Sequence, residues 1–163
     1  MLFRSDKERA VVEIDELLKR AINFILPRVK AGGIKIDITE ASSIELLVYP
    51  NELIQVLLNV LNNAVDAYVN VDKQDKTIEV HAKKVNKELL IYIKDSAGGI
   101  KHEYIQRLFE PYFSTKGKNG TGLGLYMSQM IIEKQFGGKI DVSVEGESTT
   151  FIITIPIPEE SLK

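Results

Sequence analysis

The sequence predicts an α+β fold, a two-layer sandwich in which a mixed, mostly antiparallel sheet is covered on one face by about three helices. First, the apolar residues of 51–70 recur at helical spacing around nearly the whole axis, which is typical of a helix in a core. Second, short stretches of alternating apolar and polar residues follow one another in pairs, as antiparallel strands do. Such strands bury one face, so they need a layer of helices against it.

The remaining elements follow from the same two periodicities. Asp15 can cap the first helix, and Pro27 is expected to kink that helix or to end its regular part. Helical spacing predicts helices over 16–30, 51–70, 102–108 and 122–136. Alternation predicts strands over 34–38, 44–48, 76–83, 89–93, 139–144 and 149–155. We expect residues 1–12 to be a frayed lead-in, and residues 109–121, which have no sustained period, to be a mobile loop.

The composition is that of an ordinary globular domain, with 163 residues of which 44% are hydrophobic and 27% are charged. A net charge of -2 predicts no general attraction to nucleic acid or to an anionic membrane. The absence of cysteine excludes disulfides and thiolate metal sites. No apolar run reaches the roughly 20 residues of a membrane span, and the charged start of the chain lacks a signal-peptide core. His81 and His102 have no metal-motif spacing, so we expect solvated or structural roles for both.

One stripe of the central helix is polar although the rest of it is apolar. Asn59 and Asn63 are four residues apart and therefore share a face, and Asp66 continues the stripe. Buried amides are costly unless each finds a partner. Two interpretations stay open for this stripe: hydrogen bonding to neighbouring backbone, or a cavity in which the amides coordinate a ligand. For Asp66 the plain expectation is a hydrogen bond at the helix surface.

Glycines mark a second candidate region, because six of the eleven lie between residues 98 and 124. The segment GTGLGL at 120–125 opens a predicted helix, and the backbone amides at a helix N-terminus suit a phosphate chain. A simple flexible loop is the alternative. A Walker A loop is excluded, because neither glycine-lysine pair is followed by Ser or Thr. A dinucleotide fingerprint is also excluded, because the third glycine position holds Met127 and no strand precedes the motif.

The order of these motifs is distinctive. An Asn-x3-Asn helix is followed by Asp-x2-Gly-Gly after a strand, by an aromatic and lysine-bearing loop, and by Gly-x-Gly-x-Gly opening a helix. Over about residues 11–157 the combination resembles the ATP-binding catalytic domain of sensor histidine kinases, in the superfamily of gyrase, heat-shock chaperone and mismatch-repair ATPases. The resemblance implies a Bergerat-type fold and ATP with Mg²⁺ as cofactors.

The resemblance also implies roles for individual residues. Asn63 and Asn59 would hold Mg²⁺ against the phosphates, Asp95 would accept a hydrogen bond from the adenine amine, and Lys116 would neutralise the terminal phosphates. The implied nucleotide site comprises Asn59, Asn63, Asp95, Ala97, Gly99, Ile100, Lys116, Gly120, Thr121, Gly122, Leu123, Gly124, Leu125 and Thr149. The lid would carry Phe109, Pro111, Phe113, Ser114 and Thr115. The sequence departs from the family pattern at Ser96, Ala97 and Ser148, where asparagine, glycine and glycine are commoner.

One position bears on the choice between kinase and hydrolase. Related ATPases have a glutamate general base one turn before the metal asparagine, and here that position is Asn59, whose amide cannot take a proton at neutral pH. The sequence therefore predicts a protein-histidine kinase domain that hydrolyses ATP poorly alone and passes the γ-phosphate to a histidine on a separate dimerisation domain. A nucleotide-sensing module without phosphotransfer is one alternative. A superfamily ATPase or serine-directed kinase is the other.

The resemblance gives expectations about organisation and partners as well. Residues 1–12 would be the lead-in from a dimerisation domain before residue 1, residues 13–157 the catalytic domain, and residues 158–163 a tail. The phosphoacceptor histidine would lie outside this chain, and a response regulator receiver domain would be an indirect partner. We expect an isolated, cytoplasmic monomer without nucleic acid or membrane contact, although the parent protein can be membrane-anchored.

Overall fold

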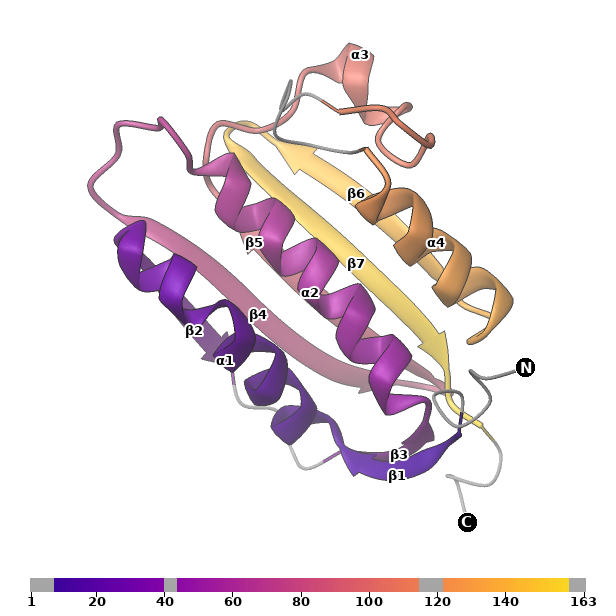
Figure 1. Ribbon diagram of the computed structural model, residues 1–163. Helices are drawn as coiled ribbons and strands as arrows, with labels where there is room; N and C mark the ends of the chain where they lie inside the picture. Colours follow the sequence, from indigo (N-terminus) through magenta and orange to yellow (C-terminus); the bar gives the residue numbers. More distant parts are fainter. Residues whose placement is uncertain (1–7, 40–43, 115–121, 159–163) are drawn as a thin grey trace.

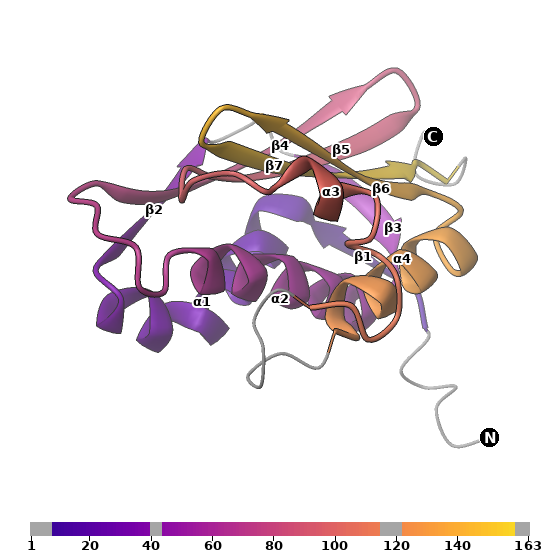
Figure 2. The same ribbon diagram turned by 90° about the horizontal axis from the view of Figure 1, so that it is seen from above.

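The computed structural model describes residues 8–39, 44–114 and 122–158. A sheet forms one layer, and the helices α1, α2 and α4 lie side by side on one of its faces, as predicted (Figure 1, Figure 2). The helices are α1 (Ile14–Ala31), α2 (Pro50–Ala67), α3 (His102–Ile105) and α4 (Gly124–Lys134). The strands are β1 (Ala10–Glu13), β2 (Ile34–Thr39), β3 (Glu45–Val48), β4 (Lys76–Val85), β5 (Glu88–Asp95), β6 (Lys139–Glu145) and β7 (Ser148–Pro156).

The main sheet has the strand order β2-β4-β5-β7-β6. The pair β2 and β4 is parallel, because α2 lies between these strands in the chain, and the other three pairs are antiparallel. The mixed, mostly antiparallel sheet is therefore confirmed. Its register places Asp95 at the end of β5 directly opposite Thr149 of β7, which matters for the site below.

The beginning of the described chain differs from the expected frayed lead-in. Residues 10–13 form β1, which pairs antiparallel with β3 in a separate small sheet. The N–H of Ile14 also donates to the carbonyl oxygen of Ile44 at 2.9 Å. Alternation in β1 is too short to have predicted a strand, and only the pairing with β3 reveals it.

Helix α1 corrects one local expectation. Asp15 lies inside the first turn, and the N-cap position is held by Glu13, which makes no side-chain cap hydrogen bond. The helix continues past Pro27 to Ala31, one residue beyond its predicted end. Proline removes one hydrogen bond, but Val29 beyond it is still buried at 3% exposure, so packing of the apolar face outweighs the loss.

Helix α2 is the core helix that the sequence predicted. It lies between α1 and α4 and under the sheet, and Leu53, Leu57 and Val60 are fully buried (Figure 2). Each buried leucine of this kind contributes about 2 kcal/mol through burial. The sheet side of the core is made mainly of isoleucines, among them Ile78, Ile91, Ile93 and Ile153. Because α2 is packed in the core, its polar residues Asn63 and Asp66 are held close to the strand ends that carry Asp95 and Thr149.

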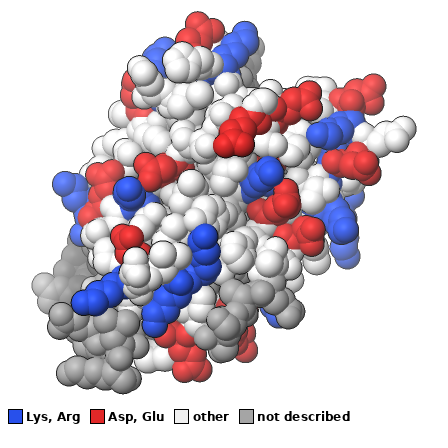
Figure 3. All heavy atoms as spheres, turned by 180° about the vertical axis from the view of Figure 1, so that it is seen from behind, with Lys and Arg blue, Asp and Glu red and all other residues white. Residues whose placement is uncertain are grey.

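Among the described residues, no helix layer covers the opposite face of the sheet. Acidic and basic side chains are interspersed on the surface seen from this side (Figure 3). Within the part of the chain that the structure describes, no helix has the length and apolar character needed to cross a membrane.

Candidate functional site

A cavity of about 810 Å³ opens between the C-terminal half of α2 and the ends of β5 and β7. This volume falls in the range of small-molecule sites, which is roughly 300 to 1,000 Å³. The lining residues are Arg28, Asn63, Asp66, Ala67, Val69, Asn70, Asp95, Ala97, Gly99, Ile100, Leu108 and Thr149. Six residues singled out from the sequence therefore meet in one cavity, namely Asn63, Asp95, Ala97, Gly99, Ile100 and Thr149.

Asp95 is the charged residue most deeply placed in this cavity. It is 4% exposed, and its Oδ1 accepts one hydrogen bond from the N–H of Ala97 at 3.1 Å. Burial raises the pKa of Asp95 from 3.8 to about 6, while the Ala97 hydrogen bond opposes that rise. A carboxylate can accept about four hydrogen bonds, so this single contact leaves capacity for a donor on a ligand. The site therefore favours a bound group that carries an N–H.

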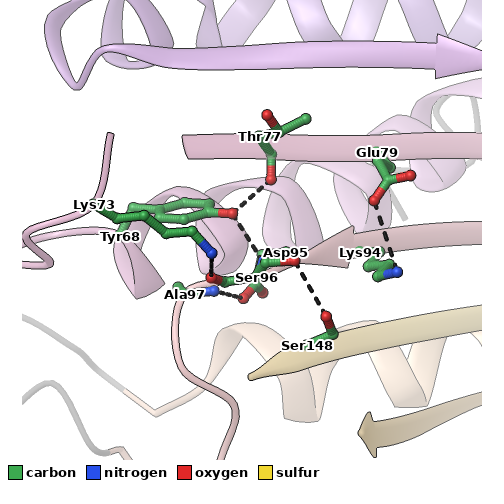
Figure 4. Close-up of polar contacts among 9 residues, drawn as sticks. All are labelled: Tyr68, Lys73, Thr77, Glu79, Lys94, Asp95, Ser96, Ala97 and Ser148. Atoms are coloured by element: carbon green, nitrogen blue, oxygen red, sulfur yellow. Dashed lines mark hydrogen bonds and ion pairs between the residues drawn. The ribbon is translucent and has the colours of Figure 1, made fainter. Parts of the chain in front are cut away.

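The residue after Asp95 is held by an arrangement that the sequence did not predict (Figure 4). The hydroxyl of Tyr68, just after α2, accepts the N–H of Ser96 at 2.8 Å and donates to the carbonyl oxygen of Thr77 at 2.6 Å. Lys73 Nζ donates to the carbonyl oxygen of Ser96 at 2.8 Å. The Oγ atoms of Ser96 and Ser148 lie 3.1 Å apart, within hydrogen-bond distance. Ser96 is thus held through its N–H, its carbonyl oxygen and its side-chain hydroxyl.

The hydroxyl of Tyr68 is well suited to this contact. The side chain is 2% exposed, and burial raises the pKa of Tyr68 above its ordinary value of 10.0, so the hydroxyl stays protonated at neutral pH. The apolar spacing of α2, extended by one position, would have predicted a buried Tyr68. The two partners of its hydroxyl come from β4 and from the end of β5, and no local pattern identifies them.

The glycine pair after β5 seats the loop against the turn between β6 and β7. The N–H of Gly98 donates to the carbonyl oxygen of Glu147 at 3.0 Å. Gly99 has φ +78°, and a Cβ there would lie 2.5 Å from the carbonyl oxygen of Gly146. Only glycine fits this position, because both the backbone angle and the contact exclude a side chain.

The two asparagines of the polar stripe lie in different surroundings. Asn63 lines the cavity. Asn59 Nδ2 donates to the carbonyl oxygen of Gly124 at 3.2 Å and to Ser128 Oγ at 2.9 Å. Its Oδ1 accepts from Gln55 at 3.3 Å. In this structure Asn59 therefore attaches α4 to α2, while Asn63 faces the space that a ligand would fill.

Asp66 makes an ion pair between two helices. Its Oδ1 lies 2.6 Å from Arg28 Nη2, and Arg28 Nη1 donates to Asn62 Oδ1 at 2.7 Å. Arg28 comes from the last turn of α1, and it also lines the cavity. The surface hydrogen bond expected for Asp66 thus has a tertiary partner that sequence spacing does not show.

The segment before α4 begins with packed aromatic residues. The Phe109 ring makes an edge contact with the buried Phe151 at 6.3 Å between ring centres. The N–H of Tyr112 donates to the carbonyl oxygen of Gly122 at 2.9 Å. Leu123 holds the N-cap position of α4, which Gly124 begins, and Leu125 packs against the core. The predicted site residues Lys116, Gly120 and Thr121 lie outside the described residues, as does most of the predicted mobile loop.

The polar groups of the cavity fit a hard cation held together with a ligand. Asn63 offers an amide oxygen, and Mg²⁺ commonly combines few protein ligands with phosphate and water. No group of three or more His, Cys, Asp or Glu side chains that could hold a metal alone occurs among the described residues. His81 stacks on Tyr92 on the outer side of the sheet, and His102 begins α3, so neither histidine belongs to the cavity.

The sequence of this chain matches a family model and a curated relative. The family model described as "Histidine kinase-, DNA gyrase B-, and HSP90-like ATPase" matches residues 48–159. The Sensor protein SrrB of Staphylococcus aureus (strain NCTC 8325 / PS 47) is 42% identical over 111 residues, which is 64% of this chain and 18% of SrrB. The chain thus spans less than a fifth of that curated relative.

Solved structures share the whole architecture. The nucleotide-free catalytic domain of histidine kinase ThkA superposes with a TM-score of 0.83 at 25% identity, over 94% of this chain and 99% of that one. Full-length ShkA in complex with AMPPNP gives a TM-score of 0.76 at 25% identity, over 91% of this chain and 31% of that one.

Proposed function

This chain belongs to the histidine kinase-, DNA gyrase B- and HSP90-like ATPase family, and we propose that it is the ATP-Mg-binding catalytic domain of a two-component sensor histidine kinase. The likeness to SrrB and to the ThkA catalytic domain supports the kinase branch of that family. The γ-phosphate of ATP would pass to a histidine on a separate dimerisation domain, and a response regulator would receive it afterwards.

The observation that carries the proposal is the buried Asp95 at the inner end of a cavity whose other wall holds Asn63. An adenine amine would supply the N–H donor that the Asp95 carboxylate can accept, and Gly99 would let the ring approach the backbone. Thr149, 2% exposed and paired with Asp95 across the sheet, closes the same end. The complex of ShkA with AMPPNP, an ATP analogue, supports a nucleotide as the ligand.

In the proposed reaction the chain acts mainly by positioning. A nitrogen of the acceptor imidazole would attack the γ-phosphorus, and the bond from that phosphorus to the bridging oxygen would break, leaving its electron pair on ADP. Bound Mg²⁺ would supply neutralisation of the phosphate charge. The Asn63 amide oxygen would hold the ion, while Lys116 and the amides of the 120–125 segment would hold the phosphates. Asn59 donates to α4 and has no carboxylate, so this position does not prime water for hydrolysis.

The acceptor would come from outside this chain, in the same protein or in trans. His81 lies on the outer side of the sheet, and His102 lies on a four-residue helix. Neither occupies the long amphipathic helix that a dimerisation domain would use. We propose that the catalytic unit begins at Ala10 rather than at residue 13, because β1 pairs with β3, and that it extends to residue 157.

The test supplies the chain with γ-labelled ATP and a separately made dimerisation domain that carries the acceptor histidine. Acid-labile label on that domain supports the proposal, and the same domain with its histidine replaced by alanine is the control. Saturable ATP binding without transfer to any cognate acceptor would favour a nucleotide-sensing module. Rapid phosphate release by the chain alone would favour an ATPase.

A further inference from the structure

Arg28 lies at the nucleotide cavity although it belongs to α1, an element to which the proposed function gives no role. We propose that Arg28 is a nucleotide-binding residue whose guanidinium contacts the phosphate chain of ATP or ADP. This inference rests on the proposed function and adds one residue to its binding site. It is carried by the position of Arg28 in the cavity, by its fixed orientation and by the charge balance of the cavity wall.

The guanidinium of Arg28 is fixed before any ligand arrives. Nη1 donates to Asn62 Oδ1 at 2.7 Å and Nη2 to Asp66 Oδ1 at 2.6 Å, so two neighbouring side chains of α2 hold its planar fork. These contacts use two of the five N–H groups that a guanidinium carries. Because the side chain is already ordered, a ligand that bonds to the other N–H groups loses less conformational entropy on binding.

The charges of the cavity wall require a cation. Among the described lining residues there are two carboxylates, Asp66 and Asp95, and Arg28 is the one cation. A polyphosphate beside an unpaired Asp66 would be repelled. The positive guanidinium of Arg28 offsets the charge of Asp66 and can still attract an anion.

The position of Arg28 along the cavity indicates which part of the nucleotide it meets. Asp95 and Thr149 form the buried end, where the base is proposed to bind. The Arg28 side chain is 45% exposed, so it lies toward solvent, where the remainder of a nucleotide must extend. The planar N–H groups of arginine match phosphate oxygens in geometry and in charge. Adenosine, which lacks phosphate, would not use this contact.

The test measures binding of adenosine, ADP and ATP by isothermal titration calorimetry to the wild type and to Arg28→Ala, Arg28→Gln and Lys30→Ala. Lys30 is an exposed cation in the same last turn of α1 and is the matched control. We expect the two Arg28 variants to lose about tenfold in ADP and ATP affinity, with adenosine affinity and the Lys30 variant unchanged. ADP and ATP affinities that stay at the wild-type level in the Arg28 variants would overturn the inference, and so would an equal loss for adenosine.

A second pair of variants separates direct contact from mere neutralisation of Asp66. In the Asp66→Asn background the repelling carboxylate is gone, while an amide oxygen remains to accept from Arg28. If Arg28 contacts phosphate, adding Arg28→Gln to this background still weakens ATP binding about tenfold. An unchanged ATP affinity would show that Arg28 serves only to offset Asp66. Circular dichroism of each variant establishes that it is folded, and a wild type that binds no ATP would refute the proposed function itself.

Discussion

The Tyr68 hydroxyl accepts the Ser96 N–H at 2.8 Å, and this hydrogen bond joins the end of α2 to the loop that follows Asp95. The same hydroxyl donates to the Thr77 carbonyl oxygen on β4 at 2.6 Å. One buried oxygen atom therefore links the helix that carries Asn63 to the strand that carries Asp95. The contact therefore helps to position both Asn63 and Asp95.

Replacement of Tyr68 by phenylalanine tests that link. The change keeps the ring but removes both hydrogen bonds, so the partly buried Ser96 N–H and Thr77 carbonyl oxygen lose this partner. We expect a loss of about 1 to 3 kcal/mol in the free energy of unfolding, measured by urea denaturation, and weaker ATP binding by calorimetry. Tyr112→Phe is the control, because Tyr112 is 77% exposed. Wild-type stability of Tyr68→Phe would mean that the hydroxyl contributes little.

Asp95 gives the nucleotide-free domain a specific pH dependence. Its folded-state pKa, about 6, lies above its ordinary 3.8, so the folded protein binds this proton more tightly than the unfolded chain does. The contribution of Asp95 to stability is therefore greatest below about pH 4 and decreases as the pH rises to 6. The shift corresponds to about 3 kcal/mol.

Asp95→Asn tests this pH dependence, because its side chain keeps an oxygen to accept the Ala97 N–H but does not titrate. We expect the thermal unfolding temperature of the nucleotide-free variant to increase relative to that of the wild type as the pH rises from 4 to 7. The same variant should lose ATP affinity, because its amide is a poorer acceptor for the adenine amine. Parallel pH profiles for the two proteins would be inconsistent with a raised Asp95 pKa.

We expect replacement of Gly99 by alanine to cost more stability than the same replacement of Gly33. Gly99→Ala combines a positive φ with a Cβ placed 2.5 Å from the Gly146 carbonyl oxygen, whereas Gly33→Ala has a positive φ but nothing within 4 Å. We expect a loss of about 1 kcal/mol for Gly33→Ala and of at least about twice that for Gly99→Ala. Chemical denaturation gives both values, and similar losses would show that the loop after β5 can shift away.

Variants of Asn59 and Asn63 should behave differently in a magnesium titration. Asn63→Ala removes a proposed ligand, so we expect the Mg²⁺-dependent part of ATP binding to fall while the fold persists. Asn59→Asp instead replaces the amide donor to Gly124 and Ser128 with an acceptor, so we expect a loss of stability of about 1 to 3 kcal/mol. A magnesium titration that Asn63→Ala leaves unaltered would remove Asn63 from the metal site.

Periodicity was sufficient for the elements that bury one continuous face. The central helix, the hairpin of β4 and β5, and the pairing of β6 with β7 were all predicted, because each is visible within one or two windows of sequence. Six of the twelve residues that line the cavity belong to the nucleotide site implied by the sequence. These features depend on spacing, which the sequence displays directly.

Tertiary partners were not predictable in the same way. Arg28 and Asp66 are 38 residues apart, and Tyr68 and Ser96 are 28 apart, so no local pattern connects either pair. The strand β1 was missed because four residues carry too little alternation until β3 is placed beside them. The extent of α1 was predicted to within one residue at its C-terminal end, and Val29 beyond Pro27 is buried.

The strand order places β5 and β7 inside the sheet, each flanked by a strand on both sides. Amide protons in such strands exchange with solvent only through the rarer and larger openings of a domain, whereas edge strands such as β2 and β6 fray more readily. Asp95 and Thr149 thus belong to two interior strands, whose amides we expect to exchange more slowly than those of β2 and β6. The proposed base-binding end of the cavity would therefore keep its shape while the edge strands open locally.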